Sequence, residues 1–170
     1  MKYFGRVTVL CIVFAGSPCL AEPLDEHWSL ATVEDSSSYK TVTVLTQDSA
    51  NTIRDEKAEG EVLPILEFRC GTAELPALRI DWKRFISSFN TEAGFRADGG
   101  KATWLKLGVD QSNKITLSKS DADVEKLLGR IAGAQTLEIE IAPYSEAPVF
   151  AEFDISSLDS ALSSLKTACL

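Results

Sequence analysis

The sequence predicts a mainly β (α+β) fold, an antiparallel β-sandwich or curled sheet with two short helices and one disulfide. Three observations support this prediction. Segments of alternating apolar and polar residues, such as residues 78–82 and 137–141, recur along the chain, and this alternation is typical of strands with one buried face. Apolar residues at helical spacing follow only Ser120 and Ser156. Turn residues separate the strand-like segments closely, which favours antiparallel connections.

The first 21 residues have the layout of a secretory signal peptide. Lys2 and Arg6 precede a short apolar run, and small residues lead up to Ala21, where we expect cleavage. The run is shorter than the roughly 20 apolar residues that span a bilayer. We therefore predict a single β-rich domain over residues 22–170, periplasmic or secreted, with no transmembrane segment after the signal is removed.

The cysteines fit this compartment. Cys11 and Cys19 would leave with the signal, so Cys70 and Cys169 would remain, and an even number of cysteines in an oxidising compartment predicts a disulfide. Two buried free thiols are the alternative. A lipoprotein acylated at Cys19 is another alternative, disfavoured because Pro18 stands where such signals have a small residue.

The composition excludes one class of partner. The formal net charge is −8, and removal of the two basic signal residues would make it more negative by two. Nucleic-acid binding needs clustered lysines and arginines. We therefore expect no nucleic-acid partner, and the charge serves mainly to keep the protein in solution.

The first half of the remaining chain predicts three strands. Residues 28–33 alternate before a polar turn, residues 39–45 are rich in β-branched side chains, and residues 65–70 form an apolar segment that ends at Cys70. Residues 47–61 are polar without a usable period, which predicts a loop.

The second half predicts further strands and both helices. In residues 78–82, Leu78, Ile80 and Trp82 would face inward. Asp98 and Gly99 tolerate the positive φ of a tight turn, so they predict a β-hairpin between strands that contain Phe95 and residues 101–109.

The remaining elements follow in order. A strand is expected at residues 115–117, and Ser120 would cap a helix that ends near Gly133. Residues 137–141 and 149–155 alternate again, and an amphipathic helix with Ser156 or Ser157 as its cap would carry Cys169 back to the core. The large aromatic residues are expected to face inward, namely Trp82, Trp104, Phe95 and Phe153.

Several short motifs, taken in order, resemble the VasI family of type VI secretion-associated periplasmic proteins. They are Trp28, Glu34-Asp35-Ser36, Leu66 to Cys70, Ile80-Asp81-Trp82, Phe95 to Gly99, Trp104, Ser118, Pro143-Tyr144, and Phe153 through Leu158 to Cys169. The resemblance implies an accessory role near a type VI secretion apparatus, without catalysis. Ala142 departs from the pattern, where threonine is expected, and so does the charged segment at residues 47–61.

Motifs for catalysis or metal binding are missing from the sequence. It has no Gly-x-Ser-x-Gly, no phosphate-binding glycine loop and no His-Glu-x-x-His, so we predict no catalytic residue, no metal site and no cofactor. His27, the only histidine, lies close to the expected mature terminus and is interpreted as a bystander. Glu138 and Glu140 would lie about 7 Å apart on one strand face, a spacing that two carboxylates of a glycoside hydrolase could use; a solvated strand face is the favoured interpretation.

Four residues are candidates for binding a partner. Arg69, Arg79 and Arg96 could mark a patch that recognises carboxylates or acidic sugars, although surface ion pairs of Arg79 with Asp81 and of Arg96 with Asp98 would explain two of them equally. Tyr144, which follows Pro143 in a polar loop, is the aromatic residue expected to be exposed.

These observations lead to one functional hypothesis and two alternatives. The leading hypothesis is a non-enzymatic periplasmic accessory or adaptor protein with a protein partner in the cell envelope. The alternatives are a cell-wall-active hydrolase that uses the strand carboxylates, and a small periplasmic inhibitor or ligand-binding module.

Overall fold

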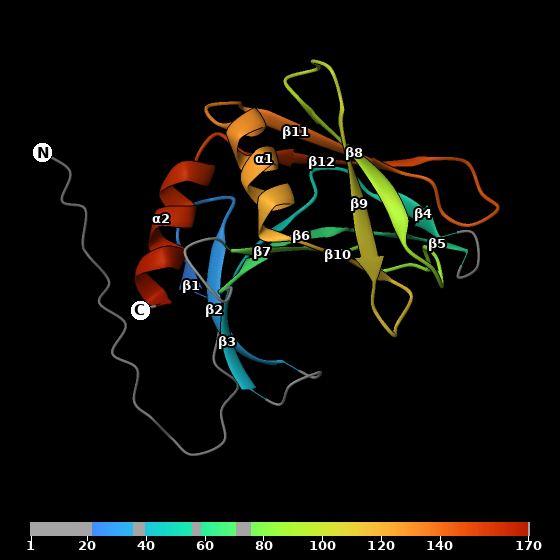
Figure 1. Ribbon diagram of the computed structural model, residues 1–170. Helices are drawn as coiled ribbons and strands as arrows, with labels where there is room; N and C mark the ends of the chain where they lie inside the picture. Colours follow the sequence, from blue (N-terminus) through green and yellow to red (C-terminus); the bar gives the residue numbers. More distant parts are fainter. Residues whose placement is uncertain (1–21, 36–39, 56–58, 71–75, 170) are drawn as a thin grey trace, which may run out of the picture.

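The computed structural model describes residues 22–35, 40–55, 59–70 and 76–169 (Figure 1). The expected signal peptide therefore lies outside the described residues, as does most of the polar turn that follows the first long strand. Ten strands form one sheet, in the order β1-β2-β3-β6-β7-β10-β9-β8-β11-β12, and β4 with β5 forms a separate hairpin. Each pairing of neighbouring strands is antiparallel, which confirms the predicted fold class.

The bounds of the elements are as follows. The strands are β1 Glu22–Pro23, β2 Ser29–Asp35, β3 Lys40–Asp48, β4 Ile53–Asp55, β5 Gly60–Val62, β6 Ile65–Arg69, β7 Ala77–Asp81, β8 Thr91–Ala97, β9 Thr103–Val109, β10 Ile115–Ser118, β11 Thr136–Ile141 and β12 Val149–Asp154. The helices are α1 Asp121–Ile131 and α2 Leu158–Ala168. Neither helix, nor any other helical stretch in the described residues, has the length and apolar character that crossing a bilayer requires.

The sheet curls until its last strand, β12, meets the end of β3 and the segment that follows it. The Gln47 side-chain amide donates to the Asp154 carbonyl at 2.7 Å, and the Ala50 N–H donates to the Glu152 carbonyl at 2.7 Å. The Asn51 side-chain carbonyl accepts from the Glu152 N–H at 2.8 Å. These bonds satisfy backbone groups at the edge of β12. If left unpaired, such groups could pair with a strand of another chain.

The core fills the inside of this curled sheet. Leu78, Ile80 and Trp82 are buried on β7 and just after it, as predicted, and the Trp82 indole donates to the Thr116 hydroxyl at 3.0 Å. Phe95 and Phe153 are buried as well. Burial of aromatic side chains of this size provides much of the hydrophobic stabilisation of a small domain.

Two local predictions were wrong. Trp104 is not a core residue, because 52% of its surface is exposed. Residues 47–61 are not a simple loop either. β3 continues to Asp48, and β4 pairs with β5 in a short hairpin in which Ile53 and Asp55 are buried. β4 and β5 have only three residues each, so the alternation of buried and exposed side chains is too short to recognise in a segment with many charged residues.

The hairpin and the helix ends agree with the sequence, with one exception. Asp98 and Gly99 have φ of 47° and 69°, as the tight turn between β8 and β9 requires. The Ser120 hydroxyl accepts from the Asp123 N–H at 3.2 Å and so caps α1. At α2 the N-cap residue is Ser157, but its side chain makes no capping hydrogen bond.

The predicted disulfide joins Cys70, just after β6, to Cys169 at the end of α2, with 5.7 Å between the two Cα atoms. Helix α2 lies against β3 and buries Leu158, Ala161 and Leu165. Figure 1 shows α2 beside β1 and β2 at one end of the sheet. The disulfide therefore ties the last element of the chain to the middle of the sheet.

Candidate functional site

The most distinctive exposed surface lies on the four neighbouring strands β12, β11, β8 and β9. Phe150, Glu140, Gly94 and Trp104 lie opposite one another in a row that crosses all four strands. Residues directly opposite in an antiparallel sheet share a face. We call this surface, which faces away from the core, the outer face.

Trp104 lies flat on this face because Gly94 has no side chain. A Cβ built on Gly94 would be 3.0 to 3.1 Å from three consecutively bonded atoms of the indole, Cε2, Cζ2 and Cη2. Near-equal distances to three bonded ring atoms place that point over the ring face rather than beside its edge. One face of the indole thus covers the backbone of β8, and the opposite face is left to solvent.

An open hollow of about 710 Å³ lies beside this ring. Its lining includes Trp104, the carboxylates of Glu92 and Glu140, and the ammonium-bearing side chains of Lys106 and Lys119. Glu92 is 4.0 Å from Lys106. This separation is at the limit of an ion pair, so both groups remain able to bind something else.

Arg96 lines a second hollow on this face. Its guanidinium is 2.5 Å from the Glu138 carboxylate and 3.9 Å from that of Glu140. With Glu138 and Glu152, it lines a hollow of about 460 Å³ farther along the outer face. Glu138 and Glu140 do share a face, as predicted, but they are half-buried and bridged by Arg96 rather than simply solvated.

Asp98 does not pair with Arg96. Instead, its carboxylate accepts hydrogen bonds from the backbone N–H groups of Thr136 and Gln135, at 2.9 and 3.0 Å. These bonds, that of Thr136 most of all, hold the pKa of the Asp98 carboxyl below its ordinary value. Asp98 therefore fastens the β8–β9 turn to the start of β11.

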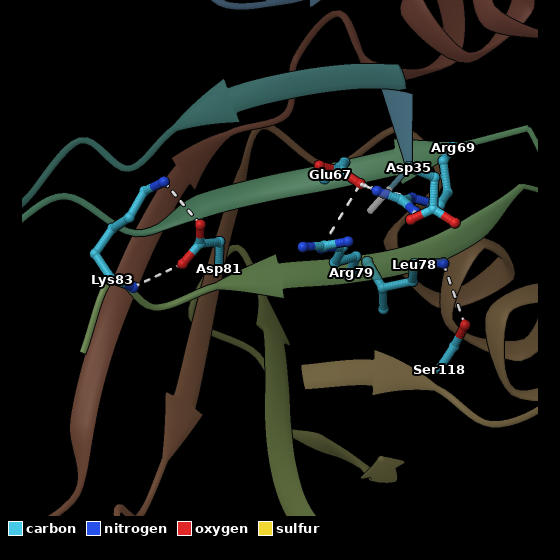
Figure 2. A network of polar contacts seen from close by, with 8 residues as sticks. All are labelled: Asp35, Glu67, Arg69, Leu78, Arg79, Asp81, Lys83 and Ser118. Carbon is cyan, nitrogen blue, oxygen red and sulfur yellow. Dashed lines mark hydrogen bonds and ion pairs between the residues drawn. The ribbon is translucent and has the colours of Figure 1, made fainter. Parts of the chain in front are cut away.

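Arg69 and Arg79 lie together, but away from Arg96. In Figure 2 both point toward Glu67, with Asp35 beside Arg69. Arg69 is 2.5 Å from Glu67 and 3.3 Å from Asp35, and Arg79 is 3.9 Å from Glu67.

The three arginines therefore do not form one patch. β10 and β9 separate β7 from β8 in the sheet, and each guanidinium already has a carboxylate partner. The expected pair of Arg79 with Asp81 is absent, since Asp81 binds Lys83 at 2.7 Å instead (Figure 2).

Tyr144 is exposed, as expected, and a second aromatic residue joins it. We call residues 82–90, between β7 and β8, and residues 142–148, between β11 and β12, the aromatic loops. They carry Phe89, which is 72% exposed, and Tyr144, which is 66% exposed. The Tyr144 N–H donates to the Ile86 carbonyl at 2.8 Å, so the two loops are joined directly.

A buried arginine reinforces that junction. The Arg84 guanidinium bonds to the Glu146 carboxylate and to the Arg54 carbonyl, while its side chain is almost wholly buried. It therefore links both aromatic loops to β4. This role could not be predicted from the sequence, because arginine is mostly an exposed residue. Phe89 was missed for a related reason, since nothing in its local pattern distinguishes an exposed phenylalanine from a core residue.

No group of three or more potential ligands that could hold a metal ion occurs among the described residues. His27 lies 3.5 Å from the Asp154 carboxylate, with both side chains partly exposed. This is a surface contact between the start of the described chain and the end of β12.

Comparison of this chain with protein-family models, with curated proteins and with solved structures found no match.

Proposed function

We propose that this chain is an exported, non-enzymatic accessory protein that contacts a protein partner in the cell envelope through its aromatic loops. The observation that carries the proposal is the exposure of Phe89 and Tyr144 on two joined loops. Large aromatic residues are enriched where proteins bind one another. The resemblance to the VasI family adds the proposal that the partner belongs to a type VI secretion apparatus.

The anchoring of these loops supports the proposal. Binding costs less when the contacting side chains are already held in place, because less conformational entropy is lost. The ion pair of Arg84 with Glu146 joins the two aromatic loops, and the backbone bond from Tyr144 to Ile86 adds a second link. The two exposed rings are therefore mounted on a constrained support.

The first experiment maps the contact in cells. A photo-reactive amino acid at position 144 is expected to form a discrete adduct with an envelope protein. The same amino acid at position 24 is the matched control, because Leu24 is exposed and apolar but remote from the aromatic loops. Replacement of both Phe89 and Tyr144 by serine should remove the contact. In a strain with a type VI apparatus, the same change should reduce secretion as much as deletion of the gene does. Equal adducts from positions 24 and 144 would contradict the proposal.

A cell-wall hydrolase remains the second candidate function, because Glu138 and Glu140 do lie on one face. Their shared contact with Arg96 speaks against it, because the guanidinium lies 2.5 Å from the Glu138 carboxylate and 3.9 Å from that of Glu140, whereas a glycosidase needs both carboxylates free to flank the glycosidic bond. Purified protein should therefore release no muropeptides from cell walls. Release that disappears in a variant with Glu138→Gln and Glu140→Gln would establish the hydrolase instead.

A further inference from the structure

We propose that the hollow beside Trp104 binds a neutral oligosaccharide built from pyranose rings, at a site separate from the protein contact proposed above. Five side chains carry the argument. They are Trp104, Glu92, Lys106, Lys119 and Glu140, and all of them line the hollow.

The first step concerns the ring itself. Gly94 supports one face of the Trp104 indole and leaves the other open. The face of an aromatic ring is electron-rich, so it attracts the weakly positive C–H groups that cover one side of a pyranose. Such stacking needs an aromatic ring that is held in place on one face and exposed to solvent on the other.

The second step concerns charge. Two carboxylates and two ammonium groups surround the ring, so the lining is balanced. An anionic ligand would be attracted by the lysines and repelled by the glutamates, and a cationic ligand would meet the reverse. A nucleic acid would also be repelled by the formal net charge of −8. A neutral ligand avoids both penalties.

The third step concerns hydrogen bonding. Glu92 is 4.0 Å from Lys106, and Glu140 is 3.9 Å from Arg96, so neither carboxylate has a short ion pair here. Within the described part of the chain, Lys119 has no carboxylate within ion-pair distance. Hydroxyl groups both donate and accept, and hydrogen bonds to charged groups are stronger than neutral ones. A sugar can therefore use the carboxylates and the ammonium groups together.

These features favour a sugar over a protein at this position. Lysine and glutamate are depleted at protein interfaces, yet they make up most of the charged lining around Trp104. The volume of about 710 Å³ lies within the range of small-molecule sites, roughly 300 to 1,000 Å³. Among the described residues, Trp104 is also the one aromatic residue in the lining, so that part of the chain does not supply the several rings of a cage for quaternary ammonium groups.

The experiment uses the fluorescence of tryptophan. Trp28 and Trp82 are fully buried, so acrylamide quenching of the purified protein reports mainly on Trp104. The probes are a soluble β-linked N-acetylglucosamine tetramer and cellotetraose. At least one of them should protect Trp104 from quenching in a saturable way, and calorimetry should give the same Kd. If neither probe binds, the proposal is wrong.

Four variants locate the site. Gly94→Val should raise Kd at least tenfold, because its side chain would collide with the indole and displace it. Lys119→Ala should raise Kd several-fold, and Trp104→Ala should abolish the calorimetric signal. Lys126→Ala, an exposed lysine on α1, is the matched control and should leave Kd unchanged. Circular dichroism and thermal unfolding verify that each variant is folded.

One further result separates this inference from the proposed function, and another tests whether a second copy of the chain covers Trp104. Trp104→Ala should abolish glycan binding but keep the cross-link from position 144, so either proposal can fail alone. Protection of Trp104 that grows with protein concentration in the absence of glycan would mean that a second copy of the chain covers the ring. That result would overturn the proposal, as would glycan binding that Trp104→Ala leaves unchanged.

Discussion

Asp98 stabilises the fold in a way that its residue type alone does not suggest. It has a positive φ of 47°, which aspartate and asparagine tolerate better than most residues. The same carboxylate accepts three hydrogen bonds, two from backbone N–H groups and one from the Thr136 hydroxyl. The sequence predicted the turn from the backbone preference. The partners of the carboxylate, Gln135 just before β11 and Thr136 at its start, are 37 and 38 residues away in the chain, so the local sequence did not reveal them.

The pH dependence of stability follows from these bonds. The folded-state pKa of Asp98 lies below its ordinary value, so the carboxylate stabilises the protein above an ordinary pKa of about 3.9. That contribution is lost as the pH falls through the lower, folded-state pKa. Asp98→Asn should therefore lower stability at pH 7 and make little difference at the acid end of this range.

Urea unfolding at several pH values measures this effect. The difference in unfolding free energy between the wild type and Asp98→Asn should shrink as the pH drops below about 4. Glu125→Gln, at an exposed position of α1, is the control for loss of a negative charge. A difference that stays constant with pH would show that the charge of Asp98 is unimportant.

At the scale of elements, the alternation of inward and outward side chains along a strand predicted burial better than residue type did. In β9, Leu105 and Leu107 are buried, while Trp104 and Lys106 are exposed. The alternation alone therefore places Trp104 on the outer face, and its size and apolar character led to the wrong prediction. The stacking on Gly94 was not accessible in the sequence, because it depends on the register between β8 and β9.

The arginine candidates show the same limit. The sequence identified Arg69, Arg79 and Arg96 correctly as residues on strands. The partners of Arg79 and Arg96 come from other strands, and only Arg69 has its main partner on its own strand. Glu67 and Glu138 are the main partners, and the pairing of β8 with β11 decides that Arg96 lies opposite Glu138. Pairing across a sheet requires the strand order, which this alternation pattern does not encode.

The link between the aromatic loops and β4 gives a prediction at this scale. Arg84→Met should lower the unfolding free energy by about 3 kcal/mol, because removal of one partner of a buried ion pair leaves the other without compensation. We expect this value, at the low end of the usual range, because Glu146 is partly exposed and water can reach it. Urea unfolding measures the change.

A second substitution separates the charge from the packing. Adding Glu146→Gln to Arg84→Met removes the carboxylate left without its partner, so the double variant should recover part of the lost stability. If the double variant is instead less stable than Arg84→Met by the full effect of Glu146→Gln alone, the two side chains do not interact in solution.

At the scale of the whole molecule, the sequence predicts that the protein is exported. Residues 1–21 are expected to direct the chain out of the cytoplasm and to be removed after Ala21. Fractionation of expressing cells should recover a periplasmic form whose N-terminal residue is Glu22, and mass spectrometry determines that residue. Replacing Lys2 and Arg6 by glutamate is the control, and it should retain the chain in the cytoplasm. An uncleaved chain in the cytoplasm of the wild type would contradict the prediction.

The disulfide also acts on the whole molecule, because it joins residues 99 positions apart. Closing a loop of about 100 residues restricts the unfolded chain by up to ~4.7 kcal/mol, and measured effects are commonly 2 to 4 kcal/mol. We expect Cys169→Ala to lower the unfolding free energy by about 2 to 4 kcal/mol. Folding itself should survive, because Leu158, Ala161 and Leu165 stay buried on α2 and hold the helix on the sheet without the bond.

Urea unfolding and thiol titration test this expectation together. Cys70→Ala should cost about as much as Cys169→Ala, and the double variant should cost little more than either, since each change alone already breaks the same bond. A wild-type chain produced from Glu22 onward should show no free thiol when unfolded without reductant and two after reduction. Two titratable thiols before reduction would refute the disulfide, and costs that add up in the double variant would show that each cysteine stabilises the protein through its own packing.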